Sequence, residues 1–403
     1  MSSSRTTLVV GQSGGATAVI NATLAGVVES ARETGRFSRV IGMRYGFEGL
    51  LGDELVDLSA QDPAVIAGLR NTPSAALGTS RKKLGDADFA MVLQKLGALD
   101  AGAVVFIGGN DSADSAHRLH QAAEASRYDL SVISAPKTID NDLPLTDHCP
   151  GYPSLAKFLA NAVRDATYDS LATPRLHPVK FIEVMGRDAG WVAAACALGF
   201  SDSERDLLPL IFMPEQPPAN AEAALAEISD RVNRDGFCVC VIPETLRDAS
   251  GRHFGGDEPL SIDAFGHPYF PSAAAAMTRL VQEKLKLRAR YERPGTAARM
   301  SVSLASSVDQ EEAYGLGWAA AARAATGASD IMVTLDRVSD APYQCAIGTA
   351  PLSQIANRVR PFPNGFATTD GRGITDSFRA YALPLLGEQP FPAYARLDFS
   401  RIV

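Results

Sequence analysis

Residues 103–112, AVVFIGGNDS, place a continuous apolar run directly before two glycines and a polar turn. Residues 7–21, TLVVGQSGGATAVIN, repeat this arrangement at the start of the chain. Runs of β-branched residues without polar interruption are typical of strands that are covered on both faces. In each case a glycine turn leads into a longer amphipathic stretch, which predicts consecutive β–loop–α units and a parallel sheet.

The same alternation extends along the 403 residues, a length that exceeds what one hydrophobic core usually serves. We expect strands in the apolar runs 7–10, 103–107, 131–134, 179–184, 208–212, 237–242 and 331–335. We expect helices at about 17–34, 113–127, 154–172, 189–199, 219–234, 272–288 and 310–327. The predicted fold class is therefore α/β, with two Rossmann-like lobes and mainly parallel sheets.

The composition argues against several classes of protein. The chain carries 38 Lys and Arg against 46 Asp and Glu, a formal net charge of −8, which is unlike a dedicated nucleic-acid binder. No apolar run reaches the ~18 residues of a membrane span, so we expect no membrane contact. The N-terminus lacks the apolar core of a secretory signal. The 5 cysteines, an odd and sparse number, favour reduced thiols in the cytoplasm.

Polar, glycine-rich segments follow the ends of the expected strands. They lie at 11–21, 108–112, 136–142, 185–191 and 243–244. Ligands in open α/β sheets bind beyond the carboxyl ends of the strands, so we expect these segments to contribute to a ligand site. The stretch 247–272 has no such pattern, and we expect a long surface loop there.

The first two glycine-rich segments are candidates for anion binding. Gly14 and Gly15 precede an expected helix, so backbone N–H groups could face a phosphate, although a plain tight turn fits equally well. In the second segment, Gly109 clears space for a ligand. Asp111 could hold a metal, accept a hydrogen bond or cap the helix expected at 113–127.

Residues 133–146, ISAPKTIDNDLPLT, contain two alternating carboxylates. Asp140 and Asp142 project to the same side of an extended loop, where repulsion raises one pKa and lets the pair divide its work. Lys137 could place a cation near the same centre, and Arg187 could contact an anionic ligand. The competing interpretations are a solvated acidic turn and a surface ion pair.

Taken in order, these segments resemble the phosphofructokinase family over roughly residues 7–300. The resemblance rests on the early Gly-Gly and on LGTSR (77–81), GGNDS (108–112), PKTIDND (136–142), MGRDAGW (185–191) and PET (243–245). The pyrophosphate-dependent branch is indicated, because ATP-using relatives carry glycine where this chain has Asp111 and Lys137. A carboxylate at 111 would repel the α-phosphate of a nucleotide. An ammonium group at 137 would balance charge on the transferred phosphoryl group.

The resemblance implies a glycolytic reaction, the reversible transfer of phosphoryl from diphosphate to the 1-hydroxyl of fructose 6-phosphate. The products are fructose 1,6-bisphosphate and phosphate. Asp140 would act as the base, with Lys137, Asp111 and Arg187 as further catalytic residues. Diphosphate would contact Gly14, Gly15, Arg81 and Gly109. The sugar phosphate would contact Thr138, Asp140, Asp142, Met185, Gly186, Arg187, Glu244, Arg290 and Arg299.

Mg²⁺ is the implied cofactor, with Asn110 and Asp111 as candidate ligands. Asn110 stands where many relatives place an aspartate, so the metal would depend mainly on diphosphate oxygens, on water or on Asp111. Thr296 stands where some relatives place a histidine or tyrosine against the sugar.

In this family the active site lies in the cleft between the two lobes. The diphosphate-binding lobe would comprise 1–151 with about 300–365, and the sugar-phosphate-binding lobe about 152–299 with 366–403. Some phosphate ligands come from a neighbouring subunit, which implies a homodimer or homotetramer. Three alternatives stay open: the same chemistry with sedoheptulose 7-phosphate, an ATP-dependent phosphofructokinase, and a catalytically weak regulatory paralogue.

Overall fold

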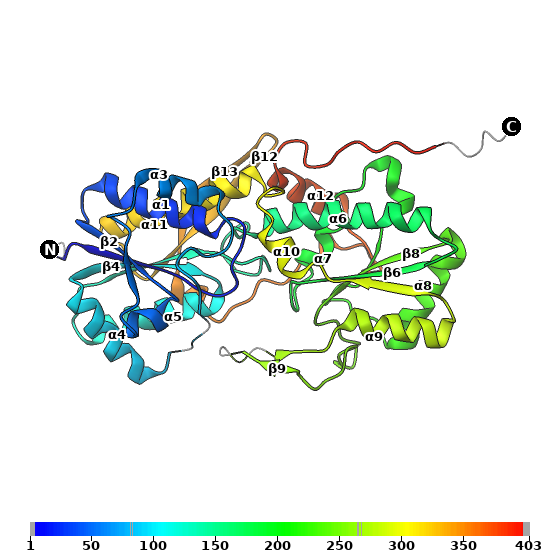
Figure 1. Ribbon diagram of the computed structural model, residues 1–403, viewed down its shortest axis with the longest axis horizontal. Helices are drawn as coiled ribbons and strands as arrows, with labels where there is room; N and C mark the ends of the chain where they lie inside the picture. Colours follow the sequence, from blue (N-terminus) through cyan, green and yellow to red (C-terminus); the bar gives the residue numbers. More distant parts are fainter. Residues whose placement is uncertain (1–4, 81, 83, 264–265, 267, 398–403) are drawn as a thin grey trace.

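The computed structural model describes residues 5–80, 82, 84–263, 266 and 268–397, which form two lobes (Figure 1). The first lobe is built on a seven-stranded sheet in the order β13-β12-β5-β4-β1-β2-β3. Its strands are β1 (Thr7–Gln12), β2 (Arg39–Met43), β3 (Leu55–Asp57), β4 (Ala101–Gly108), β5 (Ser131–Pro136), β12 (Ile331–Asp340) and β13 (Tyr343–Pro351). Neighbouring strands are parallel except at the two edges, where β12–β13 and β2–β3 are antiparallel.

Helices bury both faces of this sheet. One face is covered by α1 (Ile20–Thr34), α3 (Pro63–Gly68) and α11 (Ser307–Ala325), and the other by α2 (Phe47–Leu51), α4 (Asp86–Ala98) and α5 (Asn110–Ala125). Helices α1 and α11 pack backbone to backbone, because a Cβ at Gly26 would lie 2.1 Å from the Tyr314 carbonyl oxygen. A Cβ at Gly317 would lie 1.9 Å from the Thr23 carbonyl oxygen. Helix α11, from late in the chain, is therefore an integral part of one layer of the first lobe.

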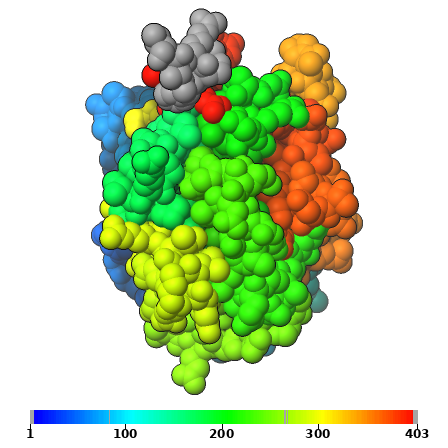
Figure 2. Space-filling model, turned by 90° about the vertical axis from the view of Figure 1, so that its right-hand side faces the viewer, coloured from blue at the N-terminus to red at the C-terminus, as the bar shows by residue number. Residues whose placement is uncertain are grey.

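The second lobe contains a parallel four-stranded sheet in the order β11-β6-β8-β7. Its strands are β6 (Val179–Val184), β7 (Leu210–Ile211), β8 (Cys238–Pro243) and β11 (Ala289–Glu292). On one face lie α6 (Tyr152–Ala172), α7 (Trp191–Ala195) and α12 (Asp376–Ala382), and on the other α8 (Ala221–Asp235) and α9 (Ala273–Leu280). Figure 2 shows this lobe end-on, with the orange C-terminal segment beside the green segments of the lobe.

The structure confirms the predicted α/β class and the mainly parallel sheets. The chain passes from lobe to lobe between Ile355, in the core of the first, and Phe362, in the core of the second. The domain boundaries themselves stay a prediction.

Cys238 and Cys240 lie buried on β8, as expected of a covered strand, with their sulfur atoms 3.4 Å apart. Among the described residues, no helix is long and apolar enough to cross a membrane.

Several elements differ from the sequence-based expectation. Helix α5 begins at Asn110 with Gly109 as its N-cap residue, so Asp111 lies in the first turn and does not cap the helix. The helix expected at 272–288 ends as α9 at Leu280, followed by a π-helical turn (Val281–Leu285) and by β11. Strand β12 continues beyond the apolar run into a hairpin with β13. Strands β2 and β3 and helix α4 were not expected from the sequence.

The expected surface loop at 247–272 contains a small antiparallel ribbon. Its strands are β9 (Ser261–Ile262) and β10 (Pro268–Tyr269). Helix α10 (Gly295–Met300) lies near the middle of the molecule, where the two lobes meet (Figure 1). Both segments contribute side chains to the cleft, as the lining of its cavities shows.

Candidate active site

Loops from both lobes converge on a cavity of about 100 Å³, which we call the small cavity. It is lined by Gly14, Gly15, Gly109, Asn110, Asp111, Ser112, Lys137, Thr138, Asp140, Asp142 and Arg187. All but Arg187 follow β1, β4 and β5 of the first lobe, and Arg187 follows β6 of the second. The carboxyl ends of strands from both sheets therefore face one site between the lobes, where α/β proteins bind ligands.

The side chain of Lys137 is buried beside the first glycine loop, and its backbone lies beside the second. The residue is 4% exposed, and a Cβ added at Gly14 would lie 3.2 Å from its Nζ atom. Gly14 also has a φ of +76°, which side-chain-bearing residues rarely adopt. A Cβ at Gly109 would lie 3.5 Å from the Lys137 carbonyl oxygen. Glycine at position 14 lets the first loop approach the lysine ammonium group, whose charge lies at the small cavity.

Asp140 and Asp142 lie on the loop that follows β5. The Thr138 hydroxyl accepts a hydrogen bond from the Asp140 backbone N–H at 3.1 Å, which shapes the loop. Burial, and then the negative charge of Asp140, raises the pKa of Asp142 to about 6, although Arg187 acts to lower it. The two carboxyl groups are therefore electrostatically coupled, as expected of a pair in which one member exchanges a proton.

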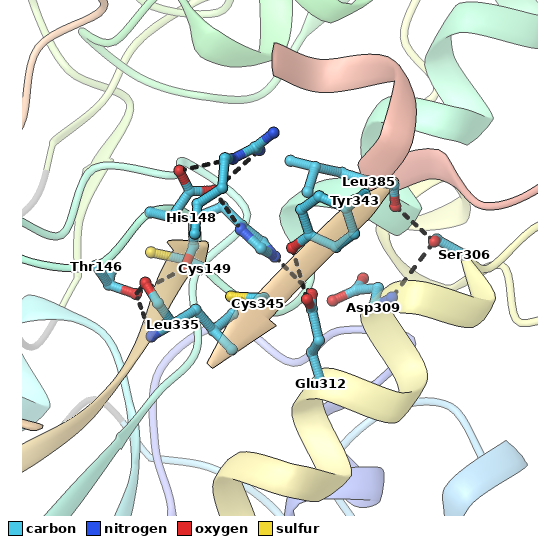
Figure 3. A network of polar contacts seen from close by, with 12 residues as sticks. Thr146, His148, Cys149, Ser306, Asp309, Glu312, Leu335, Tyr343, Cys345 and Leu385 are labelled. Atoms are coloured by element: carbon cyan, nitrogen blue, oxygen red, sulfur yellow. Dashed lines mark hydrogen bonds and ion pairs between the residues drawn. The ribbon is translucent and has the colours of Figure 1, made fainter. Parts of the chain in front are cut away.

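A buried ionic network holds the segment that follows this loop (Figure 3). His148 is 0% exposed and lies 2.9 Å from Asp147 and 2.7 Å from Glu312. Burial acts to lower the pKa of His148, but the hydrogen bonds to both carboxylates outweigh it and raise the pKa to about 9. Arg337 donates to Asp147 at 3.0 Å, and Tyr343 donates to Glu312 at 2.6 Å. The network thus ties the segment to α11 and to the β12–β13 hairpin.

A second cavity of about 300 Å³, which we call the large cavity, adjoins the small one. The two share Gly15, Lys137, Thr138, Asp140 and Arg187. The large cavity is also lined by Ala16, Ile139, Met185, Glu244, Tyr269, Thr296 and Arg299. Burial, and then the charges of Asp140 and Glu183, raises the pKa of Glu244 to about 7. That carboxyl group can therefore donate or accept a hydrogen bond near neutral pH.

Backbone strain orients Arg187 between the two cavities. Arg187 has a φ of +49°, and Gly186 before it has a φ of +119°. A Cβ at Gly186 would lie 2.9 Å from the Cβ of Val192, so only glycine fits there. Strain of this kind persists where the surrounding structure enforces it, often at functional sites. Arg299 of α10 lies so close to the first glycine loop that a Cβ at Gly15 would be 2.7 Å from its Nη1 atom.

Arg290 does not join Arg299 within one chain. Strand β11 pairs with β6 so that Arg290 lies opposite Lys180, near the start of β6, whereas Arg187 follows the end of β6. Lys180, and to a smaller extent Arg290, lowers the pKa of Asp169 at that distant end. Arg290 and Arg299, both expected to contact the sugar phosphate, therefore do not meet at one cavity within the described chain. Arg81, the remaining candidate for diphosphate binding, lies outside the described residues.

Asn110 borders the small cavity, but its side-chain amide is hydrogen-bonded to a segment far away in the sequence. Its NH₂ group donates to the Arg358 carbonyl oxygen, and its amide oxygen accepts from the Asn357 backbone N–H at 2.7 Å. This pairing argues against Asn110 as a metal ligand and leaves Asp111 as the candidate carboxylate. Within the described ranges, no group of three or more His, Cys, Asp or Glu residues could hold a metal ion.

Several residues at the site were not found from the sequence, among them Ser112 and Ile139 in the cavity linings and two residues outside every predicted motif. Tyr269 of β10 lines the large cavity, although its segment suggested only a long loop whose length was the one available signal. Arg360 donates to backbone carbonyls of the loop that carries Asp140 and Asp142. No motif surrounds Arg360, so local sequence held no sign of its role.

Comparisons with known proteins agree with this architecture. A family model described as phosphofructokinase matches residues 7–323. The pyrophosphate–fructose 6-phosphate 1-phosphotransferases of Xanthomonas campestris and Methylococcus capsulatus are 41% and 38% identical, over 95% of this chain and 92% of their own. The crystal structure of the pyrophosphate-dependent phosphofructokinase from Nitrosospira multiformis matches with a TM-score of 0.87 and 36% identity, over 97% of this chain and 94% of that one. This chain belongs to the phosphofructokinase family.

Proposed function

We propose that this protein reversibly transfers phosphoryl from diphosphate to the 1-hydroxyl of fructose 6-phosphate, giving fructose 1,6-bisphosphate and phosphate. One observation carries the proposal: Asp111, Lys137 and Asp140 line the same cavity of about 100 Å³. The names of the three relatives described above support this choice of substrates, since each matches over almost the whole chain and is named as a pyrophosphate-dependent enzyme.

The size and charge of the small cavity select a short inorganic donor. Pockets for drug-sized ligands typically enclose ~300–1,000 Å³, so about 100 Å³ suits a diphosphate better than a nucleotide. The carboxylate of Asp111 would repel the α-phosphate of ATP. The ammonium group of Lys137 balances charge on the phosphoryl group in transfer and on the phosphate that leaves. Such fixed charges supply much of the catalysis in phosphoryl transfer.

The large cavity holds the acceptor, and Asp140 lies where the two cavities meet. Asp140 accepts the proton of the sugar 1-hydroxyl as its oxygen attacks phosphorus, and it returns that proton in the reverse reaction. A positioned base of this kind typically contributes ~10²–10⁴-fold to the rate. Met185, Glu244 and Arg299 hold the sugar phosphate, and Arg187 reaches both substrates.

The site fits Mg²⁺ carried largely by the substrate. Asp111 supplies one carboxylate at the small cavity, whereas the amide of Asn110 is already paired with the backbone. Mg²⁺ commonly binds through one or two carboxylates, substrate phosphates and several waters, which agrees with this sparse donor set. When bound, the ion neutralises charge on the diphosphate oxygens.

We also propose that the protein works as a homo-oligomer in the cytoplasm. Arg290 lies away from the cavities of its own chain, and in this family a neighbouring subunit supplies some phosphate ligands. Arg290 would then bind the 6-phosphate in the partner's site. All five cysteines are free, as thiols are in a reducing compartment.

A donor comparison tests the function directly. Purified protein is assayed with Mg²⁺ and fructose 6-phosphate, with either diphosphate or ATP as donor, and formation of fructose 1,6-bisphosphate is measured. We expect turnover with diphosphate and at most trace turnover with ATP. Preferred use of ATP would overturn the donor assignment. A higher kcat/KM with sedoheptulose 7-phosphate would replace the acceptor and leave the donor unchanged.

A further inference from the structure

Residues 357–360 cross between the lobes beside the active site, and we call them the strap. They lie between Ile355, in the core of the first lobe, and Phe362, in the core of the second. The orange segment that contains them passes from one lobe towards the other in Figure 1. The strap contacts both the residue that opens α5 and the loop that carries the two active-site carboxylates. It is therefore placed to set the spacing between these two parts of the site.

One end of the strap is held by Asn110, the first residue of α5. The amide oxygen of Asn110 accepts from the Asn357 backbone N–H at 2.7 Å, and its NH₂ group donates to the Arg358 carbonyl oxygen. The Asn357 side chain donates in turn to Asp114, one helical turn further along, at 2.7 Å. An asparagine amide both donates and accepts, whereas an ionised aspartate only accepts. Asn110 therefore makes a pair of bonds that aspartate would reduce to one.

The other end is held by Arg360, which lies against the catalytic loop. Its Nη1 donates to the carbonyls of Thr146 at 2.8 Å and Asp147 at 2.6 Å, and its Nη2 donates to that of Asn141 at 2.7 Å. Its backbone N–H donates to the Asp142 carbonyl oxygen at 2.7 Å.

Arg360 also contacts the second lobe. Its guanidinium lies 4.6 Å from the ring of Trp191 in α7. The Trp191 indole N–H donates to the Arg360 carbonyl oxygen at 3.4 Å. A planar guanidinium can stack on an aromatic ring while its N–H groups bind several acceptors, which a lysine ammonium cannot reproduce.

We propose that Asn110 and Arg360 are positioning residues for phosphoryl transfer. Together they clamp the strap between the start of α5 and the loop after β5 that carries Asp140 and Asp142. The inference rests on the proposed function for its chemistry. Phosphoryl transfer depends mainly on geometry and electrostatics, and a displacement of about 1 Å can cost about 100-fold in rate. With the strap held at both ends, Asp111 at the start of α5 and Asp140 keep a fixed spacing across the small cavity.

The kinetic test uses the full-length variants Asn110→Asp and Arg360→Lys and the double variant. Asn110→Asp removes the bond to the strap carbonyl, and Arg360→Lys keeps the charge but loses the planar fork. We expect each to lower kcat by about 10- to 100-fold with less than about threefold change in either KM. The kcat of the double variant should be little lower than that of the less active single variant, because both substitutions release the same strap. Val359→Thr, at a strap side chain that is 64% exposed, is the matched control and should match wild type.

Amide hydrogen exchange gives a second readout that needs no substrate. The backbone N–H groups of Asn357 and Arg360 donate from the strap to Asn110 and to Asp142, so a loosened strap opens these bonds more often. Both single variants should therefore speed exchange over 355–363 and over 141–147, and Val359→Thr should not. Faster exchange with an unchanged kcat would make the clamp merely structural and overturn the proposal. Slower turnover with unchanged exchange would also overturn it.

The same variants distinguish the clamp from a metal-binding role of residue 110 and from an error in the donor assignment. A lower Mg²⁺ requirement or a higher kcat in Asn110→Asp would mean that residue 110 faces the metal, and would overturn the clamp. If wild type turned over only with ATP, the donor assignment would fail. The same variants, measured with ATP and by exchange, would still test the strap.

Discussion

Replacing Lys137 by methionine removes a buried charge while nearly preserving side-chain length. Lys137 is 4% exposed, so its charge acts across a small, enclosed cavity. Two unit charges about 4 Å apart interact by ~4 kcal/mol at an effective dielectric constant of about 20. The loss of one preorganised electrostatic contact typically lowers kcat by ~10²–10³-fold, or about 2.7–4 kcal/mol. We expect this fall in kcat, with a much smaller rise in the KM for diphosphate, because the charge is needed most as phosphoryl transfers.

The assay measures initial rates in both directions at saturating Mg²⁺, with diphosphate and then fructose 6-phosphate varied. The control is Lys95→Met, which removes the same charge from α4 of the same lobe, where Nζ pairs with Asp53 at 2.6 Å. This control should retain wild-type kinetics. A loss confined to the KM for diphosphate would show that Lys137 binds the ground state only. A wild-type kcat in Lys137→Met would refute the electrostatic argument.

Asp140→Ala should lower turnover in both directions by at least ~10²–10⁴-fold while fructose 6-phosphate binding, measured by calorimetry, stays near normal. Wild-type rates from this variant would remove Asp140 from the role of base. His148→Gln should lower the free energy of unfolding by about 3–5 kcal/mol at pH 6, because it removes the buried cation that bonds Glu312 and that shares Asp147 with Arg337. The pKa of His148 is raised to about 9 in the folded protein, above its unfolded value of ~6.5, so its stabilisation is complete below pH ~6.5 and lost as pH rises through 9. Urea unfolding from pH 6 to 10 should therefore show that the difference in the free energy of unfolding between the variant and wild type shrinks as pH rises. A difference that stays constant would contradict a positively charged His148.

Local patterns were sufficient for the fold class and for the family, and the comparisons confirm both predictions. Strand hydrophobicity and glycine turns are properties of short stretches, so the β–loop–α units could be recognised one by one. Parallel strands place their carboxyl ends at one edge of a sheet. For that reason the segments of Gly14, Asp111 and Asp140 could be expected together, and all three residues line the small cavity. Arg187 also lines it, but it follows a strand of the second sheet, so only the packing of the two lobes brings it there. Their individual roles stay predictions.

The sequence by itself determined which residues could take part in phosphoryl transfer, because motif chemistry is local. Only the tertiary structure decided what each of them contacts. Asn110 suggested a weak metal ligand, yet its amide bonds the backbone of Arg358, 248 residues away. Arg360 lies in no motif, and Arg290 lies at the far end of a strand from the cavities. Such contacts join residues that are far apart in the sequence, and they form only when the two lobes pack and the strap crosses between them. The hydrophobic pattern of a short stretch carries no information about contacts at that separation.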